Sequence, residues 1–393
     1  MTKIVHDIDH SARAHSNVGG STAKRVMNCT ASVELCAKYP NVESEFAAEG
    51  SALHEATDFI LQGKTEKDTE VIGLTFNKYV ITQEMYDEAI VPALEYFDML
   101  DKELGGLDYF NEQRVIFPGI DGAFGTVDIV AGSKDRAVVL DWKFGRGVAV
   151  DAENNDQLMY YAYAAANTAP TSKLFSKDKP IELFIVQPRV RDGEPFTRWI
   201  TSYQQLEVFA MELKKAVAIS QTSEASFKMG SWCKFCNAKL GCPLYQNAVE
   251  DVGMLSQDDL QAQFEKYAPL FDQMTDWAKA GKELMHSEME KGMQVKGFKL
   301  VAKRANRKWV DEDKALKYLA RMRVPAADRY TKKFLSPSQA EKVLKTVGVS
   351  GLPDGMTEKH SSGTTLTTSS DKRAEVKITA TTMELLAAGL AGR

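Results

Sequence analysis

The sequence predicts an α/β protein in which a mixed β-sheet is flanked by helices. Residues 44–63 place apolar side chains at helical spacing, whereas residues 112–145 hold short β-branched and aromatic runs separated by Gly, Asp and Ser. A helix and a further apolar strand follow over residues 153–188. Strands in succession, then a helix, then another strand are typical of a sheet with antiparallel and parallel neighbours.

Three helices are expected before the strands. They cover residues 20–38, 44–63 and 82–104. The first has Ser21 or Thr22 as its N-cap, the second ends at Gly63, and the third stops at the glycine pair 105–106.

Strands and helices then alternate. The runs that predict strands are 112–119, 122–133, 137–145, 181–188 and 196–201, and those that predict helices are 153–167 and 203–220.

A mainly helical C-terminal region is expected after residue 250. A long amphipathic stretch covers 257–291, a strand-like run covers 298–304, and helices are predicted over 311–322 and 335–348. The tail 357–393 begins with a Ser/Thr-rich polar run and is expected to be flexible. The predicted domains are therefore 1–250, 251–356 and 357–393.

Composition favours a cytoplasmic protein. The chain has 393 residues, 44% hydrophobic residues and a net charge of −5. We expect no membrane partner, because no apolar run approaches the ~20 residues of a membrane span and the first residues lack the apolar core of a signal peptide. The sequence contains neither GxxxxGK[ST] nor GxGxxG, so nothing in it indicates an ATP-driven motor or a dinucleotide site.

Two predicted strands carry ionisable side chains among apolar ones. Asp128 lies in "GTVDIV", and Asp141 and Lys143 share one face of "VVLDWKFG" because side chains alternate along a strand. Carboxylates on buried strands are costly unless they pair or bind a cation. The pattern therefore indicates a Mg²⁺ or Mn²⁺ site, or alternatively an Asp128–Lys143 ion pair with Asp141 at a strand end.

Two helices add polar side chains to this pattern. His54 interrupts an apolar helical face, where it is either a functional residue or a satisfied core histidine. Gln157 and Tyr161 are four residues apart and share a helix face, where they either reach the site or belong to the core.

The order of these motifs carries a resemblance. In sequence they are G-x3-H at Gly50–His54, G-x-V-D at Gly125–Asp128, D-x-K at Asp141–Lys143 and Q-x3-Y at Gln157–Tyr161. This order resembles the RecB-like branch of the PD-(D/E)XK nuclease superfamily. The resemblance implies a restriction-endonuclease-like fold over 1–250 and a Mg²⁺- or Mn²⁺-dependent deoxyribonuclease.

The resemblance also implies a role for each motif residue. The expected metal ligands are His54, Asp128, Asp141 and the Trp142 carbonyl, the expected catalytic residues are Asp128, Asp141, Lys143, Gln157 and Tyr161, and Glu112 is an additional acidic candidate. It further implies exonuclease action on DNA that is single-stranded or has free ends, with a recombination or helicase partner. The alternative is a non-catalytic DNA-binding or assembly module on the same fold.

Three of the five cysteines form a C-x2-C-x5-C pattern. They are Cys233, Cys236 and Cys242, and the remaining two, Cys29 and Cys36, lie about 200 residues upstream. Thiolates at this spacing suit a metal, and a closed site needs a fourth ligand, which either upstream cysteine could supply. On spacing alone, a structural zinc site remains open.

The cysteine arrangement resembles the iron–sulfur nucleases of the same branch, including CRISPR-associated RecB-like exonucleases, AddB-type subunits and a largely uncharacterised phage and prophage family. The resemblance implies a [4Fe–4S] cluster bound by Cys29, Cys233, Cys236 and Cys242, with Cys36 left over. Such a cluster would join the first helix to the end of the nuclease domain. A role in phage or prophage DNA recombination or replication follows from the same resemblance.

The positive charge of the chain is concentrated in one segment. Residues 296–333 carry 13 Lys and Arg against four acidic residues, while the chain as a whole is acidic. The run "KRANRKW" provides five candidate DNA-binding residues, Lys303, Arg304, Arg307, Lys308 and Trp309. Cations beside an aromatic ring suit single-stranded nucleic acid. The alternative is a solvated helical face.

Overall fold

The computed structural model describes residues 2–3, 16, 18–39 and 45–298. The helices are α1 (Gly20–Asn28), α2 (Ser32–Ala37), α3 (Glu45–Leu61), α4 (Gln83–Met85), α5 (Val91–Glu103), α6 (Asp156–Ala166), α7 (Tyr203–Ser220), α8 (Pro243–Gly253), α9 (Gln257–Ala262) and α10 (Phe264–Glu290). The strands are β1 (Thr2–Lys3), β2 (Thr75–Phe76), β3 (Tyr79–Val80), β4 (Asp108–Ile116), β5 (Phe124–Gly132), β6 (Ala137–Trp142), β7 (Ile181–Val186) and β8 (Phe196–Thr201).

The main sheet is mixed, as predicted. Its strand order is β1-β4-β5-β6-β7-β8, while β2 and β3 form a separate hairpin. The strands β4, β5 and β6 form an antiparallel meander, β7 pairs parallel to β6 after the crossover through α6, and β8 returns antiparallel. Because β6 and β7 are parallel, the residues that follow both strands meet at one edge of the sheet.

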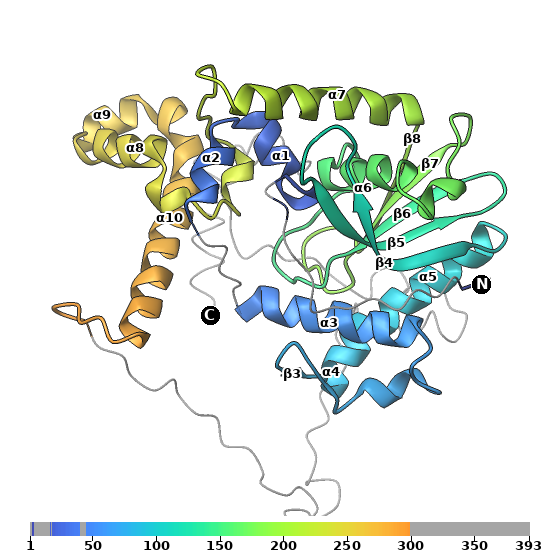
Figure 1. Cartoon of the computed structure of the whole chain (residues 1–393). Coiled ribbons are helices and arrows are strands. Elements are labelled where there is room, and N and C mark those ends of the chain that lie inside the picture. The colour runs from blue at the N-terminus through green and yellow to red at the C-terminus, as the bar shows by residue number, and fades with distance from the viewer. Residues whose placement is uncertain (1, 4–15, 17, 40–44, 299–393) are drawn as a thin grey trace, which may run out of the picture. The chain divides into compact units, whose positions relative to one another are not determined.

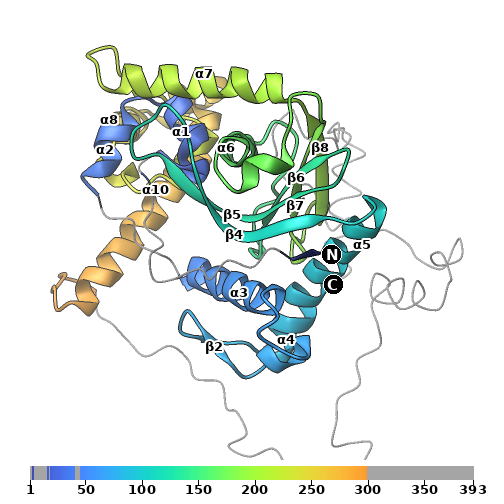
Figure 2. The same cartoon turned by 45° about the vertical axis from the view of Figure 1, so that its right-hand side comes forward.

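Helices cover both faces of the sheet. Figures 1 and 2 show α1, α6 and α7 on one face and α3, α4 and α5 on the other. Each face has its own apolar core: Val26, Leu158 and Leu213 belong to the first, and Leu53, Phe97 and Leu140 to the second. The predicted α/β architecture is therefore confirmed for the described part of the chain.

The first predicted helix is wrong in two respects. The stretch 20–38 is two helices, because Cys29 leaves the helical conformation (φ −141°, ψ 77°) and the chain turns before α2. The N-cap is Gly19 and not Ser21 or Thr22. The Thr22 hydroxyl instead accepts a hydrogen bond from the Gly19 N–H (2.9 Å), so it serves the cap from the third helical position.

Two longer predicted helices are also interrupted. The stretch 82–104 contains a π-turn over Tyr86–Ile90, followed by Pro92 at the start of α5, which has no N–H to continue the α-helical ladder. The stretch 257–291 divides at Gln263 into α9 and α10.

The regular alternation of strand side chains reverses at Glu112 and Asp128. In β5, Val127 packs in the core beneath α6 whereas Ile129 packs in the opposite core, although residues two apart normally share a face. Glu112 lies opposite this point on β4, between the Asn111–Ile129 and Gln113–Val127 pairs, and has φ +46°. This left-handed conformation is unusual for glutamate and turns the two neighbouring strands locally.

The predictions beyond residue 298 lie outside the described residues. The chain divides into two units, Met1–Leu300 and Val301–Arg393, and the second contains the five candidate DNA-binding residues of "KRANRKW". The domain boundary at residue 250 stays a prediction. Among the described helices, none combines the length and apolar character that crossing a bilayer requires.

A buried ion network holds β7 against its neighbours. Glu182 on β7 is fully buried, and its carboxylate contacts Arg136 and Arg198. Arg198 also pairs with the exposed Glu103 at 2.7 Å and lies over the Phe184 ring. The Glu182 carboxylate should therefore contribute more to the stability of the sheet than the exposed Glu103 carboxylate does.

We predict that Glu182→Gln lowers the free energy of unfolding by about 3 kcal/mol, because two arginines lose their buried partner. The matched variant Glu103→Gln removes an exposed partner of the same Arg198 and costs less than about 1 kcal/mol. Denaturant unfolding followed by circular dichroism measures both. Equal losses in the two variants would contradict the assigned role of Glu182.

Candidate functional site

The motif residues come together where β4, β5 and β6 meet α3 and α6. His54 lies near the middle of α3, and its Nδ1 is 3.2 Å from Asp128 Oδ1 on β5. Glu112 on β4 is only 5% exposed, and Asp141 near the end of β6 is 3% exposed. Four elements distant in the sequence thus place ionisable side chains in one partly buried cluster.

Three of these residues are close enough to share one cation. Ligand atoms of His54, Glu112 and Asp128 all lie within 4.8 Å of one another. An imidazole nitrogen with two carboxylates is a suitable donor set for Mn²⁺ or Mg²⁺. Glu112, only an additional candidate in the sequence, is therefore a member of the most compact donor group in the described part of the chain.

Asp141 is held by a different set of partners. Its Oδ2 is 2.7 Å from Lys143 Nζ, and its Oδ1 accepts a hydrogen bond from Gln157 Nε2 (3.1 Å). Lys143 Nζ donates to Gln157 Oε1 (3.0 Å), and Gln157 Nε2 also donates to the Tyr161 hydroxyl (3.2 Å). Gln157 therefore orients both members of the D-x-K motif from the first turn of α6.

The structure also specifies the partners of Asp128. Its second oxygen, Oδ2, accepts a hydrogen bond from the Trp142 backbone N–H at 2.7 Å. The alternative Asp128–Lys143 ion pair is not formed, because Lys143 pairs with Asp141 and His54 with Asp128. The Trp142 indole is buried and stacks on Phe144, and its carbonyl as a metal ligand stays a prediction.

Burial and charge act against each other in this cluster. Burial lowers the pKa of His54, but the carboxylates of Asp128, Glu112 and Asp141 together outweigh burial and the pKa is raised overall. Burial raises the pKa of Asp128, yet His54 and Lys143 bring it below its ordinary value. At Asp141 burial prevails and the pKa is raised, because Lys143 offsets only part of the effect and Asp128 adds to it.

The Tyr161 ring packs directly against the backbone of Gly20 and Gly125, where no other residue would fit. A Cβ on Gly20 or on Gly125 would come within 2.7 Å of the Tyr161 ring. Burial raises the pKa of Tyr161, so the phenol keeps its proton and can donate it in a hydrogen bond. The glycine of the G-x-V-D motif thus makes room for the tyrosine of the Q-x3-Y motif.

Sequence reasoning missed a buried arginine that ties α3 to the end of β6. Arg189 Nε donates to the Phe144 carbonyl (2.7 Å), and Arg189 Nη1 donates to Glu49 Oε1 on α3 (2.6 Å). Gln187 similarly binds the Val148 carbonyl (2.6 Å) and the Val150 N–H (3.1 Å). Their position in the sequence could have indicated this role. Both residues directly follow β7, which is parallel to β6, so they lie at the same end of the sheet as the D-x-K motif.

Four cysteines line one cavity between α1, α2 and the turns after α7. They are Cys29, Cys233, Cys236 and Cys242. Cys36 is not among the lining residues, but its Sγ is 3.6 Å from Cys236 Sγ. The hydrogen bond between these two sulfurs lowers the pKa of Cys236. The structure thus gathers all five cysteines.

The cysteine cavity and the carboxylate cluster share α1. The helix begins at Gly20, against Tyr161, and its C-cap is Cys29. Thr30 and Ala31, just beyond it, bind the segment after α7 through the Ser226 N–H (3.0 Å) and the Ser226 carbonyl (3.2 Å).

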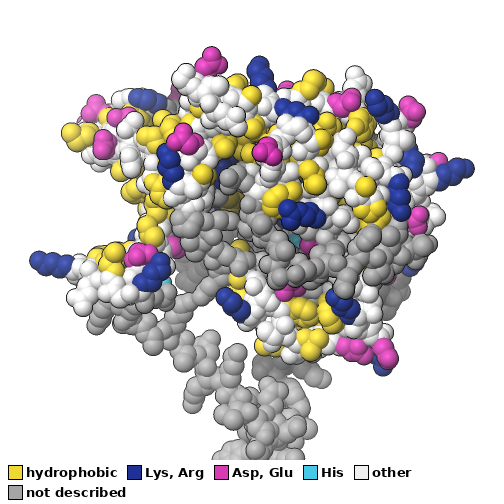
Figure 3. Space-filling view, in the orientation of Figure 1, with side chains coloured by type: hydrophobic (Ala, Val, Ile, Leu, Met, Phe, Trp, Pro, Cys, Tyr) yellow, Lys and Arg dark blue, Asp and Glu magenta, His cyan; other side chains and the backbone are white. Residues whose placement is uncertain are grey.

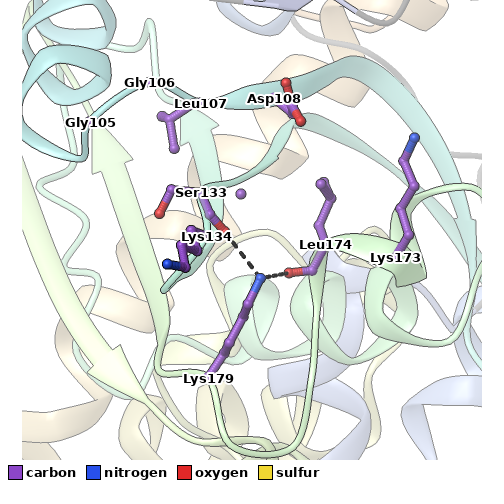
Figure 4. A pocket seen from close by; sticks show the side chains of 10 residues that line it. Gly105, Gly106, Leu107, Asp108, Ser133, Lys134, Lys173, Leu174 and Lys179 are labelled. Atoms are coloured by element: carbon purple, nitrogen blue, oxygen red, sulfur yellow. Dashed lines mark hydrogen bonds between the residues drawn. The ribbon is translucent and has the colours of Figure 1, made fainter.

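A second cavity lies at the opposite end of the sheet from Asp141. It has a volume of about 480 Å³, and Lys134, Lys173 and Lys179 are among its lining residues (Figure 4). Lys179 Nζ donates to the carbonyls of Ser133 (3.1 Å) and Leu174 (3.5 Å), which closes the turn after β5. This cavity contains none of the predicted site residues.

Positive charge is dispersed over the described residues on the face that Figure 3 shows. On the face shown in Figure 3, Lys and Arg side chains of the described residues alternate with acidic and hydrophobic ones and form no continuous patch. This face therefore offers no continuous basic surface that could bind DNA in place of the predicted basic segment.

A family model described as "Protein of unknown function (DUF2800)" matches residues 15–374. Among solved structures, the chain is similar to SSO0001 (TM-score 0.29, 11% identity, covering 60% of this chain and 90% of that one). It is also similar to an alkaline exonuclease, LHK-Exo, from Laribacter hongkongensis (TM-score 0.22, 13% identity, 52% and 87%), and to its complex with dAMP (TM-score 0.21, 11%, 52% and 87%). With TM-scores this low, we base neither fold nor function on these likenesses.

We predict that Mn²⁺ stabilises the protein through Glu112. At 100-fold excess over its Kd, a ligand of the folded state adds about 2.7 kcal/mol to the free energy of unfolding. Glu112→Gln should lose most of this gain while its metal-free form stays at least as stable, because one of three crowded carboxylates is neutralised. Thermal unfolding with and without Mn²⁺ measures the effect.

The control is Asp108→Asn, on the same strand but exposed. It should respond to Mn²⁺ like the wild type. An unchanged response in Glu112→Gln would remove Glu112 from the metal site.

Proposed function

We propose that this chain, which belongs to the family described as protein of unknown function (DUF2800), is a metal-dependent nuclease that hydrolyses phosphodiester bonds in DNA. The observation that carries the proposal is the charge balance of the cluster. Glu112, Asp128 and Asp141 are largely buried together, where Lys143 contacts Asp141 and His54 contacts Asp128. A divalent cation bound among the three carboxylates would offset their mutual repulsion.

The residues present fit such a cation. His54, Glu112 and Asp128 would hold it, with Asp141 beside them and the Trp142 carbonyl as a further donor. When bound, Mg²⁺ or Mn²⁺ lowers the pKa of a coordinated water and stabilises negative charge on a phosphoryl oxygen. This chemistry is what phosphodiester hydrolysis requires.

The other side chains have defined tasks on this proposal. The Lys143 ammonium, fixed by Asp141 and Gln157, is placed to neutralise charge that develops on the phosphate. The protonated Tyr161 hydroxyl is a hydrogen-bond donor for a phosphate oxygen. Arg189 keeps the helix that carries His54 in register with the strand that carries Asp141.

We also propose a [4Fe–4S] cluster in the cysteine cavity. Its support is that the four expected ligands line one cavity, although Cys29 is about 200 residues from the others in sequence. Four cysteine thiolates can hold either an iron–sulfur cluster or a structural zinc ion, and the cluster is proposed because the sequence resembles the iron–sulfur nucleases.

The type of nuclease, its biological role and its partners are proposed from the sequence resemblance alone. On that basis the protein is an exonuclease that acts on DNA that is single-stranded or has free ends. It would serve phage or prophage recombination or replication together with a helicase or recombination partner. The alternative is a non-catalytic DNA-binding or assembly module, which would not cleave DNA and would have no chemical need for every acidic and lysine position of the motifs.

We predict that the wild type cleaves end-labelled DNA with Mn²⁺ and that Asp141→Asn and Lys143→Ala each lower the rate at least about 100-fold. Gel analysis of 5′- and 3′-labelled single and double strands gives the rate and the polarity. Asp135→Asn, an exposed change in the turn before β6, should leave the rate unaltered. The enzyme proposal fails if the wild type cleaves none of these substrates with Mg²⁺ or Mn²⁺.

We predict that Cys29→Ser loses iron and acid-labile sulfide whereas Cys36→Ser keeps both, because Cys29 and not Cys36 lines the cavity. Anaerobic purification followed by iron and sulfide analysis measures this. The reverse pattern would make Cys36 the fourth ligand, and stoichiometric zinc without sulfide in the wild type would refute the cluster.

A further inference from the structure

Unpartnered polar atoms gather around the cysteine cavity. In the described part of the chain, three buried side-chain atoms that have no nitrogen or oxygen hydrogen-bond partner belong to residues that line this one cavity. They are Arg25 Nε, Ser32 Oγ and Tyr245 Oη. Leaving one buried polar group unsatisfied costs about 1–3 kcal/mol, so three around one cavity indicate an occupant that accepts hydrogen bonds.

Sequence spacing places each of these donors beside a cysteine. Arg25 lies four residues before Cys29, one helical turn away on α1, and the Cys29 N–H binds its carbonyl (2.8 Å). Ser32 follows Cys29 by three residues and its N–H binds the Cys29 carbonyl (2.9 Å). The donors are therefore fixed by the same backbone turn that fixes the thiol.

Tyr245 repeats this arrangement at the other end of the domain. It follows Cys242 by three residues in the first turn of α8, and its N–H binds the Cys242 carbonyl (3.1 Å). Its side chain is 1% exposed, and burial together with the neighbouring Cys233 thiol raises the pKa of the phenol. Tyr245 therefore keeps its proton and offers it toward sulfur.

Sulfur already accepts a hydrogen bond in this cavity. The Lys228 backbone N–H points at Cys29 Sγ at 3.4 Å. A protonated thiol is a weak acceptor, whereas a metal-bound thiolate or an inorganic sulfide carries negative charge and accepts more strongly. The Tyr245 hydroxyl already has a hydrogen bond with the Cys233 side chain, and all three side-chain donors gain stronger acceptors when such sulfurs are present.

We propose that Arg25, Ser32 and Tyr245 form a ring of hydrogen-bond donors to the sulfur atoms of the iron–sulfur cluster and set its reduction potential and its resistance to iron loss. The inference rests on the cluster proposed above and assigns three residues outside the cysteine motif. Tyr245 and Ser32 contribute neutral donors, and Arg25 adds a positive charge near a group that carries excess negative charge.

The direction of the effect follows from charge. One-electron reduction of the cluster makes its sulfurs more negative, so donors stabilise the reduced form more than the oxidised form. Removing one donor should make reduction about tenfold less favourable, which is a potential about 59 mV more negative for a one-electron couple. Iron release to a chelator should become faster in the same variants.

The test uses the full chain purified without oxygen, as wild type, Tyr245→Phe, Ser32→Ala and Arg25→Met. Iron, acid-labile sulfide, the midpoint potential in a dithionite titration and the rate of iron release are measured for each. The control is Tyr160→Phe, which removes a buried phenol whose hydroxyl donates to the Val18 carbonyl (3.0 Å), far from any cysteine in sequence. Circular dichroism shows whether each variant is folded.

We expect a more negative potential and faster iron release in Tyr245→Phe and Ser32→Ala, a larger effect in Arg25→Met, and neither change in Tyr160→Phe. A folded donor variant that fails to retain iron also supports the proposal. Wild-type values in all three donor variants would overturn it while leaving the cluster in place. A wild type without acid-labile sulfide would overturn the cluster and this inference together.

Discussion

The crowding of three carboxylates in one partly buried region is the constraint on which the rest of the structure depends. Glu112, Asp128 and Asp141 repel one another, and burial withholds the water that would screen them. His54 from α3 pairs with Asp128, and Lys143, just after β6, pairs with Asp141. At Asp141, however, the effect of burial exceeds that of Lys143, and the pKa is raised. On the proposed function, a divalent cation bound among these carboxylates completes the arrangement.

Much of the surrounding architecture serves to hold that cluster. Gln157 at the start of α6 binds Asp141 and Lys143 at once, and Arg189 joins α3 to the loop after β6. The helix α1 connects the cluster to the cysteine cavity, since it starts against Tyr161 and is capped by Cys29. If the cysteines hold the proposed cluster, its loss would therefore affect the carboxylate cluster through α1.

Local patterns in the sequence predicted the mixed sheet and its flanking helices, and the family resemblance implied that His54, Asp128, Asp141, Lys143, Gln157 and Tyr161 share one site. They did not predict the importance of Glu112, because its positive φ and the reversed alternation beside Asp128 are set by the tertiary structure. Arg189 was missed because its partners are a backbone carbonyl and a glutamate 140 residues away. The break at Cys29 was missed since helical spacing continues across it.

The central claim is that the carboxylate cluster binds a divalent cation, and the most direct measurement is anomalous X-ray scattering from crystals of the protein soaked in Mn²⁺. The account predicts one manganese peak bounded by His54, Glu112 and Asp128, with Asp141 adjacent. Occupied manganese elsewhere with no peak in this cluster would contradict it, as would side chains that remain in their ion pairs at saturating Mn²⁺.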